Sequence, residues 1–227
     1  MTEIRNLCKS YGNYEALKSL TLSLPDSRVT ALVGPNGSGK TTLLKCLLGL
    51  VFPDSGEIQT DSRAGYMPQV PLFPKNLKVR EILKTLSVME KKETVFQSRL
   101  LEELEVGKFQ DRYFGELSGG MKQKVNIVQC FGTDRKTYVI DEPTASLDPH
   151  MSVYLKNLIR ERKRGGASVL FTSHIMSEVE EVADSVALLV DGRLILHETP
   201  DEILKKSGAK DMESALHVFW LKAGNHV

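Results

Sequence analysis

The chain has 227 residues, of which 41% are hydrophobic and 26% are charged, and this composition excludes a disordered or fibrous protein. Such a chain can bury a core as one domain or as a core with an attached subdomain, and its formal net charge of +1 gives no electrostatic reason to expect a nucleic-acid partner. The sequence lacks a run of roughly 18–20 apolar residues, which a membrane span needs, and an apolar secretory signal, so we expect a cytoplasmic protein.

The N-terminal segment predicts two antiparallel strands. Strand-like residues at 4–8 and 19–24 lie on either side of a turn at 11–13. Tyr11 is a candidate for stacking on a nucleotide base, because an aromatic face can contact adenine without hydrogen bonds. The alternative for Tyr11, and equally for Tyr14, is packing within a strand.

The next segment has the pattern of a phosphate-binding loop. An apolar run at 29–33 leads into the spacing Gly34-x-x-x-x-Gly39-Lys40-Thr41 and then into a helix-like run ending near Leu50. Glycines let the backbone approach phosphates, while the lysine supplies a positive charge and the threonine a hydroxyl ligand for Mg²⁺. The residues predicted to hold a nucleotide are Gly34, Pro35, Asn36, Gly37, Ser38, Gly39, Lys40, Thr41 and Thr42. The alternative is a glycine-rich turn without a ligand.

The middle of the chain changes from strands to helices. A turn at 53–56 precedes strand-like residues at 57–59 and a second short strand ending near Gln69. From Val79 to about residue 106, apolar residues recur at three- and four-residue spacing, which predicts a helical insert. After a loop, Ser118-Gly119-Gly120 opens another amphipathic helix, whose free N–H groups suit an anion.

The C-terminal half predicts further strands that end in polar residues. The strand 138–140 leads directly into Asp141 and Glu142, and the carboxyl end of a parallel strand is where such sheets bind ligands. The remaining elements are expected as a polar turn at 144–149, a helix at 151–166, a strand at 168–173 ending at His174, a helix at 176–185, a hairpin at 186–198 and one or two helices at 201–222.

The order of these motifs resembles that of the nucleotide-binding subunit of ABC transporters over nearly the whole chain. The matching motifs are the Walker A sequence GPNGSGKT, the Q-loop residue Gln69, the signature LSGGM, the Walker B sequence YVIDE, the D-loop SLDP and the switch histidine His174. The resemblance implies an α/β P-loop NTPase (RecA-like) core with an antiparallel β subdomain and an α-helical subdomain. One ABC ATPase domain would cover 1–227, with the core and β subdomain at 1–78 and 136–227 and the helical subdomain at 79–135.

The same resemblance assigns chemical roles to these residues. Phosphoryl transfer needs held phosphates, a metal ion and a positioned water. The family implies ATP and Mg²⁺ as cofactors, with the phosphates on Lys40 and the P-loop amides. It implies a metal site of Thr41, Gln69 and Asp141, and a catalytic set of Glu142, His174 and Gln69. A histidine near a strand end is by itself more often structural, and its place in the motif order reverses that expectation.

The signature loop implies a second copy of the chain. The family forms a head-to-tail homodimer in which Ser118, Gly119 and Gly120 serve the nucleotide of the partner. The resemblance also places Asp148 of the D-loop among the nucleotide-binding residues. Met121 stands where the commonest signature has glutamine, and we expect ATP binding to survive because serine and glycine make the phosphate contacts. Residues 145–146 are a mild departure before the D-loop.

The resemblance also implies a transmembrane permease as partner, which would hold this cytoplasmic ATPase at the inner face of the cell membrane. Val70, Leu72 and Phe73 follow Gln69, where the family receives a helix from the permease, and the alternative is that they pack the insert onto the core. The rival function is an ABC ATPase acting on ribosomes or chromosomes. The single cassette and the short separation of Gln69 from the signature oppose that rival, and Glu142 opposes a scaffold without catalysis.

Two narrower resemblances concern the transport system. Residues 171–184 and the short C-terminus resemble ATPases of the ABC-2 exporter type, which work with a separate permease. Residues 66–83 and 117–130 are similar to the ATPase that serves copper-site maturation of nitrous-oxide reductase. The permease selects the cargo in this family, so the cassette sequence does not identify it.

Overall fold

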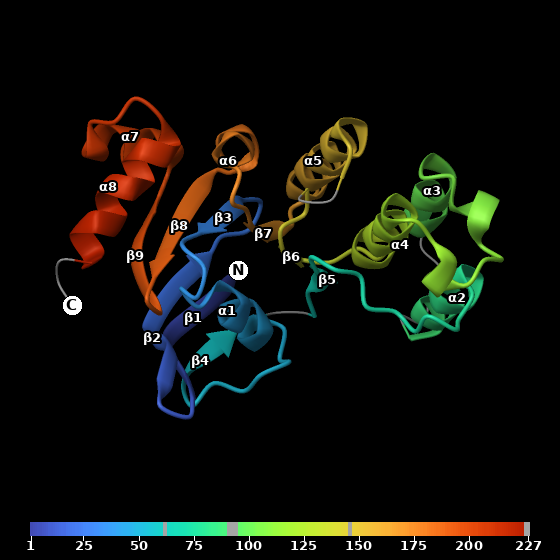
Figure 1. Cartoon of the computed structure of the whole chain (residues 1–227), viewed down its shortest axis with the longest axis horizontal. Helices are drawn as coiled ribbons and strands as arrows, with labels where there is room; N and C mark the ends of the chain where they lie inside the picture. Colours follow the sequence, from blue (N-terminus) through green and yellow to red (C-terminus); the bar gives the residue numbers. More distant parts are fainter. Residues whose placement is uncertain (61–62, 90–94, 145–146, 225–227) are drawn as a thin grey trace.

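The computed structural model describes residues 1–60, 63–89, 95–144 and 147–224. Figure 1 shows a body built on two sheets and, at the right, a lobe of helices. The helical lobe consists of α2 (Val79–Met89), α3 (Val95–Glu103), η1 (Val106–Phe109), η2 (Phe114–Glu116) and α4 (Gly119–Phe131). The predicted helical insert is thus present, while its treatment as a separate subdomain stays a prediction.

The smaller sheet is antiparallel, as the N-terminal pattern predicts. Its strands are β1 (Thr2–Tyr11), β2 (Tyr14–Leu24) and β4 (Ser55–Gln59), in the order β2-β1-β4. The strands are longer than the predicted segments, and Gly12 takes a φ of 60° at the turn between the first two. Leucines of this sheet share a buried cluster with α1 (Lys40–Leu47), which holds the helix that follows the phosphate-binding loop.

The larger sheet is parallel except at one edge. It runs in the order β5-β6-β7-β3-β8-β9, and its strands are β3 (Val29–Val33), β5 (Gly65–Met67), β6 (Thr137–Ile140), β7 (Ser168–Thr172), β8 (Ser185–Val190) and β9 (Arg193–Glu198). Only β9 is antiparallel to its neighbour, across the predicted Asp191-Gly192 turn, where both residues have positive φ. Because β5, β6, β7 and β3 are parallel neighbours, their carboxyl ends bring four separate chain segments to one edge.

The remaining helices pack on the larger sheet and form the C-terminal part of the described chain. They are α5 (Pro149–Arg164), α6 (Met176–Val182), α7 (Pro200–Ser207) and α8 (Met212–Gly224). The C-terminal segment forms two helices because Gly208 ends the first with a φ of 71°. Gly49, with a φ of 69°, follows the end of α1, and this helix is therefore shorter than the apolar run to Leu50 predicts.

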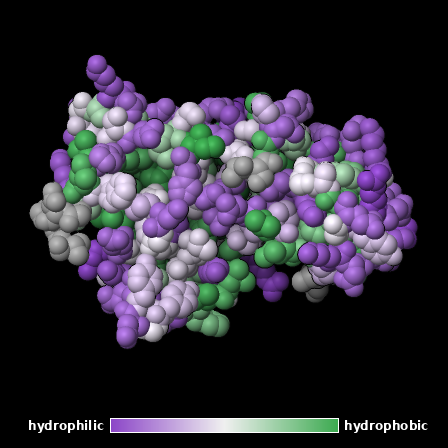
Figure 2. Space-filling model, viewed as in Figure 1, coloured by the Kyte–Doolittle hydropathy of each residue, from purple (hydrophilic) through white to green (hydrophobic). Residues whose placement is uncertain are grey.

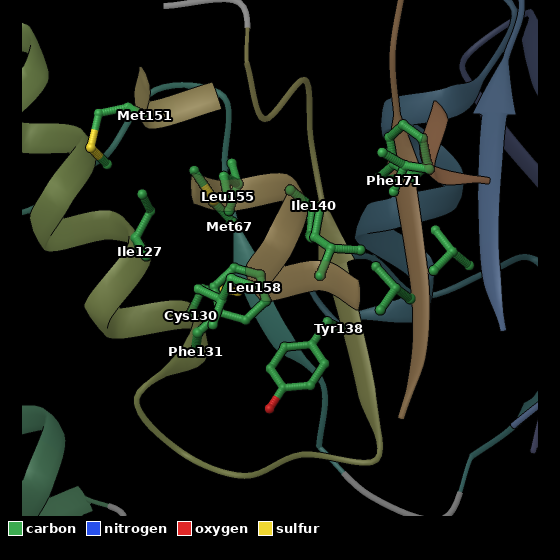
Figure 3. Packing of buried hydrophobic residues seen from close by; sticks show 14 of the residues in the cluster. Met67, Ile127, Cys130, Phe131, Tyr138, Ile140, Met151, Leu155, Leu158 and Phe171 are labelled. Atoms are coloured by element: carbon green, nitrogen blue, oxygen red, sulfur yellow. The ribbon is translucent and has the colours of Figure 1, made fainter. Parts of the chain in front are cut away.

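A buried cluster attaches the last helix of the lobe to the central strands. Figure 3 shows Phe131 of α4 and Tyr138 of β6 beside apolar side chains of α5. The two rings stack with centroids 5.1 Å apart and an interplanar angle of 18°. The Tyr138 hydroxyl donates a hydrogen bond to Thr133 O at 3.0 Å, so the one polar atom of this ring is satisfied. The helix that starts at the signature residues is thereby fixed to β6, the strand that leads directly into Asp141.

Candidate active site

The phosphate-binding loop closely approaches two other backbone segments, and these approaches explain two of its glycines. A Cβ on Gly34 would lie 2.0 Å from Leu189 O, and a Cβ on Gly39 would lie 2.4 Å from Ala16 O. Both residues also have positive φ, 150° and 104°. No other residue type fits either position without moving the neighbouring backbone. The loop then delivers the chain into α1, whose first-turn amides have no acceptor within the helix.

Lys40 is folded onto the carbonyl groups of its own loop. Its Nζ donates to Gly34 O at 2.7 Å and to Pro35 O at 3.0 Å. Burial lowers the pKa of the Lys40 ammonium, while the negative charges of Glu142 and Asp141 act in the opposite direction. The Ser38 Oγ is also buried, without a hydrogen-bond partner among the described residues. A buried ammonium and an unpaired hydroxyl in one loop fit an anionic ligand.

A cavity of about 220 Å³ brings the predicted residues together. Its lining includes Asn36, Gly37, Ser38, Gly39, Lys40, Thr41, Thr42, Gln69, Asp141, Glu142 and His174. Gly34 and Pro35 instead line a neighbouring cavity of about 290 Å³, which also touches His174 and α8. Four segments distant in the sequence therefore converge on one cavity, at the carboxyl ends of the parallel strands.

A residue of β7 holds the Asp141 carboxylate and the Glu142 backbone, which both follow β6. The Thr172 Oγ1 donates to Asp141 Oδ1 at 2.7 Å and accepts a hydrogen bond from the Glu142 amide at 2.8 Å. Glu142 has a φ of 46°, a conformation that is uncommon for a residue with a side chain. The bond to Thr172 helps to hold this conformation, which turns the chain sharply after the strand.

Both oxygens of the Glu142 carboxylate have a partner. Gln69 Nε2 donates to Oε2 at 2.6 Å, and His174 Nε2 lies 3.0 Å from Oε1. Three residues from three strand ends therefore form one connected group. A carboxylate within hydrogen-bond reach of an imidazole and an amide can orient a water molecule and accept its proton.

The helix α4 fixes the position of the Gln69 backbone. Gln123 Nε2 donates to Gln69 O at 3.2 Å, and Asn126 Nδ2 donates to Pro68 O at 3.0 Å. Both side chains are buried. Because α4 starts at the signature residues, the signature and the Gln69 loop are mechanically connected within one copy of the chain.

Several predicted residues lie on the surface and are not among the described residues that line the cavity. Ser118, Gly119, Gly120 and Asp148 are exposed. Ser118 and Asp148 also cap helices, since Ser118 Oγ accepts from the Met121 amide at 3.3 Å and Asp148 Oδ1 accepts from the Met151 amide at 2.9 Å. The departure at Ala145-Ser146 lies outside the described residues.

The tyrosines of the first hairpin divide between surface and cavity. Tyr11 is 48% exposed and is not among the described residues that line the cavity, whereas Tyr14 is. The Tyr14 hydroxyl donates to Gly37 O at 2.6 Å, and Tyr14 pairs with Tyr11 across the turn. Sequence reasoning considered Tyr14 only as a packing residue. It also missed Thr172, although a threonine at the end of an otherwise apolar strand is a usable signal.

Comparison with known proteins identifies the family. The sequence model of the ABC transporter family matches residues 17–145, more than half of the chain. This chain belongs to the ABC transporter family. A relative of this ABC transporter subunit, the lantibiotic transport ATP-binding protein SrtF of Streptococcus pyogenes, is 34% identical over 210 residues, which cover 88% of this chain and 92% of SrtF.

Solved structures confirm the predicted α/β fold with its P-loop core. An ATP-binding subunit of an ABC transporter is 29% identical, with a TM-score of 0.89 and coverage of 96% of this chain and 98% of that chain. A dimeric ATP-binding cassette in a post-hydrolysis state, bound to ADP and Pi, has a TM-score of 0.77 over 88% of this chain and 98% of that chain. At 23% identity, this second likeness shows the fold alone.

The function follows from family membership and from the relative. This ABC transporter subunit binds and hydrolyses ATP and thereby powers transport. Among the helices of the described residues, none has the length and apolar character that a membrane span requires.

Proposed function

We propose that two copies of this chain bind two ATP molecules head to tail and drive a separate membrane permease from its cytoplasmic side. The observation that carries the proposal is the division of the predicted site residues. Residues 36–42 of the P-loop, Asp141, Glu142 and His174 share one cavity, whereas the exposed signature residues lie outside its described lining. A second copy can supply the missing donors, because the N-terminus of α4 presents free amides to solvent.

Within one copy, the cavity residues divide the work of phosphoryl transfer. Lys40 and the first-turn amides of α1 hold the phosphates, and binding draws Lys40 Nζ away from the loop carbonyls. Thr41, Gln69 and Asp141 bring hydroxyl, amide and carboxylate oxygens to the same cavity, a donor set that fits Mg²⁺. The metal ion supplies charge neutralisation on the phosphate oxygens.

Glu142 and His174 act on the water and on the terminal phosphate. Glu142 orients the attacking water and accepts its proton, and His174 contacts the γ-phosphate and responds to its loss. The separation of 3.0 Å between His174 Nε2 and Glu142 Oε1 supports this pairing. Tyr11 offers its exposed ring to the adenine, next to Tyr14 at the wall of the phosphate cavity.

An exposed apolar surface supports docking to a permease. Figure 2 shows apolar atoms gathered at the lower centre of the molecule. Val70 is 61% exposed and Leu72 is 85% exposed, and Phe52, between α1 and β4, is 82% exposed. Phe73, in contrast, packs edge-on against Phe114 with centroids 5.2 Å apart. Each of the two alternatives for this segment therefore applies to part of it. Phe73 packs against the helical lobe, whereas Val70 and Leu72 are available to a partner.

The transported cargo and the narrower resemblances are a separate matter. SrtF is a lantibiotic transport protein by name, and we propose an ABC-2 exporter-type permease as the partner here. Copper-site maturation stays a prediction from residues 66–83 and 117–130. In each case the permease determines the cargo.

The substitution Gly119→Asp tests the proposed division of the site between two copies. A Cβ at Gly119 would meet nothing within 4 Å, and an acidic residue suits the first turn of a helix, so the variant should fold. Its carboxylate would repel the phosphates held by the partner. We expect ATPase activity to fall at least about tenfold, the effect of roughly 1.4 kcal/mol, while ATP affinity of the monomer is unchanged.

Gly107→Asp is the matched control, because Gly107 lies in the same lobe and is equally open. It should leave both quantities unchanged. Normal ATPase activity of the Gly119→Asp variant would contradict the proposal. A fall in monomer ATP affinity would instead place the signature in the site of its own copy.

A further inference from the structure

One carboxylate connects the loops that carry Glu142 and His174. Glu178 Oε2 accepts a hydrogen bond from Thr144 Oγ1 at 2.5 Å and another from Ser173 Oγ at 3.4 Å. Thr144 lies two residues after Glu142, and Ser173 directly precedes His174. The two loops leave the neighbouring parallel strands β6 and β7, so a single side chain on α6 spans both strand ends.

The neighbouring hydrogen bonds and the position of Glu178 in its helix favour this contact. Ser173 is buried, and its Oγ accepts a hydrogen bond from the Ile175 amide at 3.0 Å. The hydroxyl proton of Ser173 has two acceptors within reach, Glu178 Oε2 at 3.4 Å and Ile175 O at 3.5 Å, and the carboxylate is the charged one. Thr144 O accepts from the Leu147 amide at 3.0 Å, so Thr144 also anchors the chain that leads to Asp148. Glu178 itself lies in the first turn of α6, where a negative charge is favoured.

We propose that Glu178 is a positioning residue for ATP hydrolysis. Glu178 holds Thr144 and Ser173 on one oxygen atom. It thereby fixes the backbone just after Glu142 and just before His174. This arrangement keeps His174 Nε2 within 3.0 Å of Glu142 Oε1. The inference depends on the proposed roles of Glu142 and His174 and adds a residue that acts through them without touching the nucleotide.

Glu181, on the same helix, provides a comparison with a purely structural role. Its carboxylate forms ion pairs with Lys156 and, at 2.8 Å, with Arg160. Both partners belong to α5 and neither lines the described cavity. Glu181 therefore joins two helices, whereas Glu178 joins two catalytic loops.

The test compares steady-state ATP hydrolysis by four proteins: wild type, Glu178→Ala, Glu178→Gln and Glu181→Ala. The alanine variant at Glu178 should lower kcat roughly 10- to 100-fold, because a misplacement of about 1 Å can cost 10²-fold, with KM for ATP changed less than about twofold. Glu178→Gln should recover most of the lost rate, since its amide oxygen can accept both hydroxyl protons. Glu181→Ala should keep the wild-type kcat even if its melting temperature falls.

A second background separates positioning from general destabilisation. Because Glu178 acts partly through His174, Glu178→Ala should cause a smaller loss of rate in a His174→Ala protein than in the wild type. Thr144→Val, which removes one hydroxyl and little volume, should lower kcat in the same direction and provides the test if Glu178→Ala does not fold. A wild-type kcat for Glu178→Ala or Thr144→Val, or a loss that adds fully to that of His174→Ala, would overturn the inference. Normal turnover by His174→Ala itself would instead overturn the proposed function.

Discussion

The Glu142 carboxylate has Gln69 on one oxygen and His174 on the other, while its backbone amide is bound to Thr172. These contacts fix both the side-chain rotamer and the positive φ of Glu142. The geometry of Glu142, the proposed general base, thus depends on side chains from β5 and β7, the two strands that flank its own. At the scale of single residues, function depends on partners that lie about 30 to 70 positions away in the sequence.

His197 gives a prediction about pH at the same scale. Its Nε2 lies 3.0 Å from Ser185 Oγ on the neighbouring strand, and burial lowers the pKa of its imidazole from 6.5. The unfolded chain then binds the proton more readily than the folded chain. The contribution of His197 to the free energy of unfolding is fully present above pH 6.5. It is lost as the pH drops toward the lower pKa of the folded state.

We expect urea unfolding of the wild type to show this loss, at up to about 1.4 kcal/mol for each unit by which the pKa is lowered. His197→Gln can keep a hydrogen bond to Ser185 and does not titrate. Its stability should therefore change less than that of the wild type just below pH 6.5. Identical pH profiles for the two proteins would contradict the assignment.

Sequence reasoning found the residues that belong to motifs with a fixed local spacing. Gly34, Gly39 and Lys40 belong to one short motif, and their conformations follow from that motif. Glu178 and Thr172 could not be found in this way, because their partners depend on the pairing of β6 with β7. Sequence reasoning selected Tyr11 and left out Tyr14, which lines the cavity, for the same reason. Only the register of the hairpin shows that the Tyr14 hydroxyl reaches Gly37.

Arg162 illustrates how an element is held in place. This residue of α5 is 5% exposed, and its guanidinium lies 3.4 Å from the centroid of the Phe96 ring in α3. It also donates to Phe131 O at the end of α4. One side chain therefore connects a core helix to two helices of the lobe.

Arg162→Ala should lower the free energy of unfolding by about 2–4 kcal/mol, because it leaves a cavity and deprives Phe131 O of a buried donor. Arg164→Ala, an exposed arginine on the same helix, is the matched control and should cost less than about 0.5 kcal/mol. Chemical denaturation measures both. Equal, small effects would show that Arg162 does not hold the lobe.

The boundaries of elements were predicted less well than their existence. The apolar run after Lys40 has no helix-stopping residue before Gly49, and the sequence alone does not show that the last turn is lost. The C-terminal segment left one helix or two open until the φ of Gly208 settled the matter. Helix ends depend on such backbone conformations, whereas the periodicity of apolar residues predicts the middle of an element.

At the scale of the whole molecule, the exposed surface around Leu72 predicts how the ATPase meets its permease. Leu72→Glu should prevent co-purification with the permease and remove its effect on ATP hydrolysis, because a charge would be buried at the interface. The isolated variant should keep its own ATPase rate. Leu221→Glu, at a leucine of α8 that is 57% exposed, is the matched control and should keep both properties. Retained binding by Leu72→Glu would place the docking surface elsewhere.

The division of the site between two copies is the central claim, and it can be tested by measuring mass in solution. Glu142→Gln should bind Mg²⁺ and ATP but hydrolyse ATP very slowly, so the dimer held by two nucleotides should accumulate. Sedimentation at saturating ATP should give the mass of two chains, and adding Lys40→Ala to the same protein should return it to one. A Glu142→Gln protein that binds ATP and still sediments as a single chain would contradict the account.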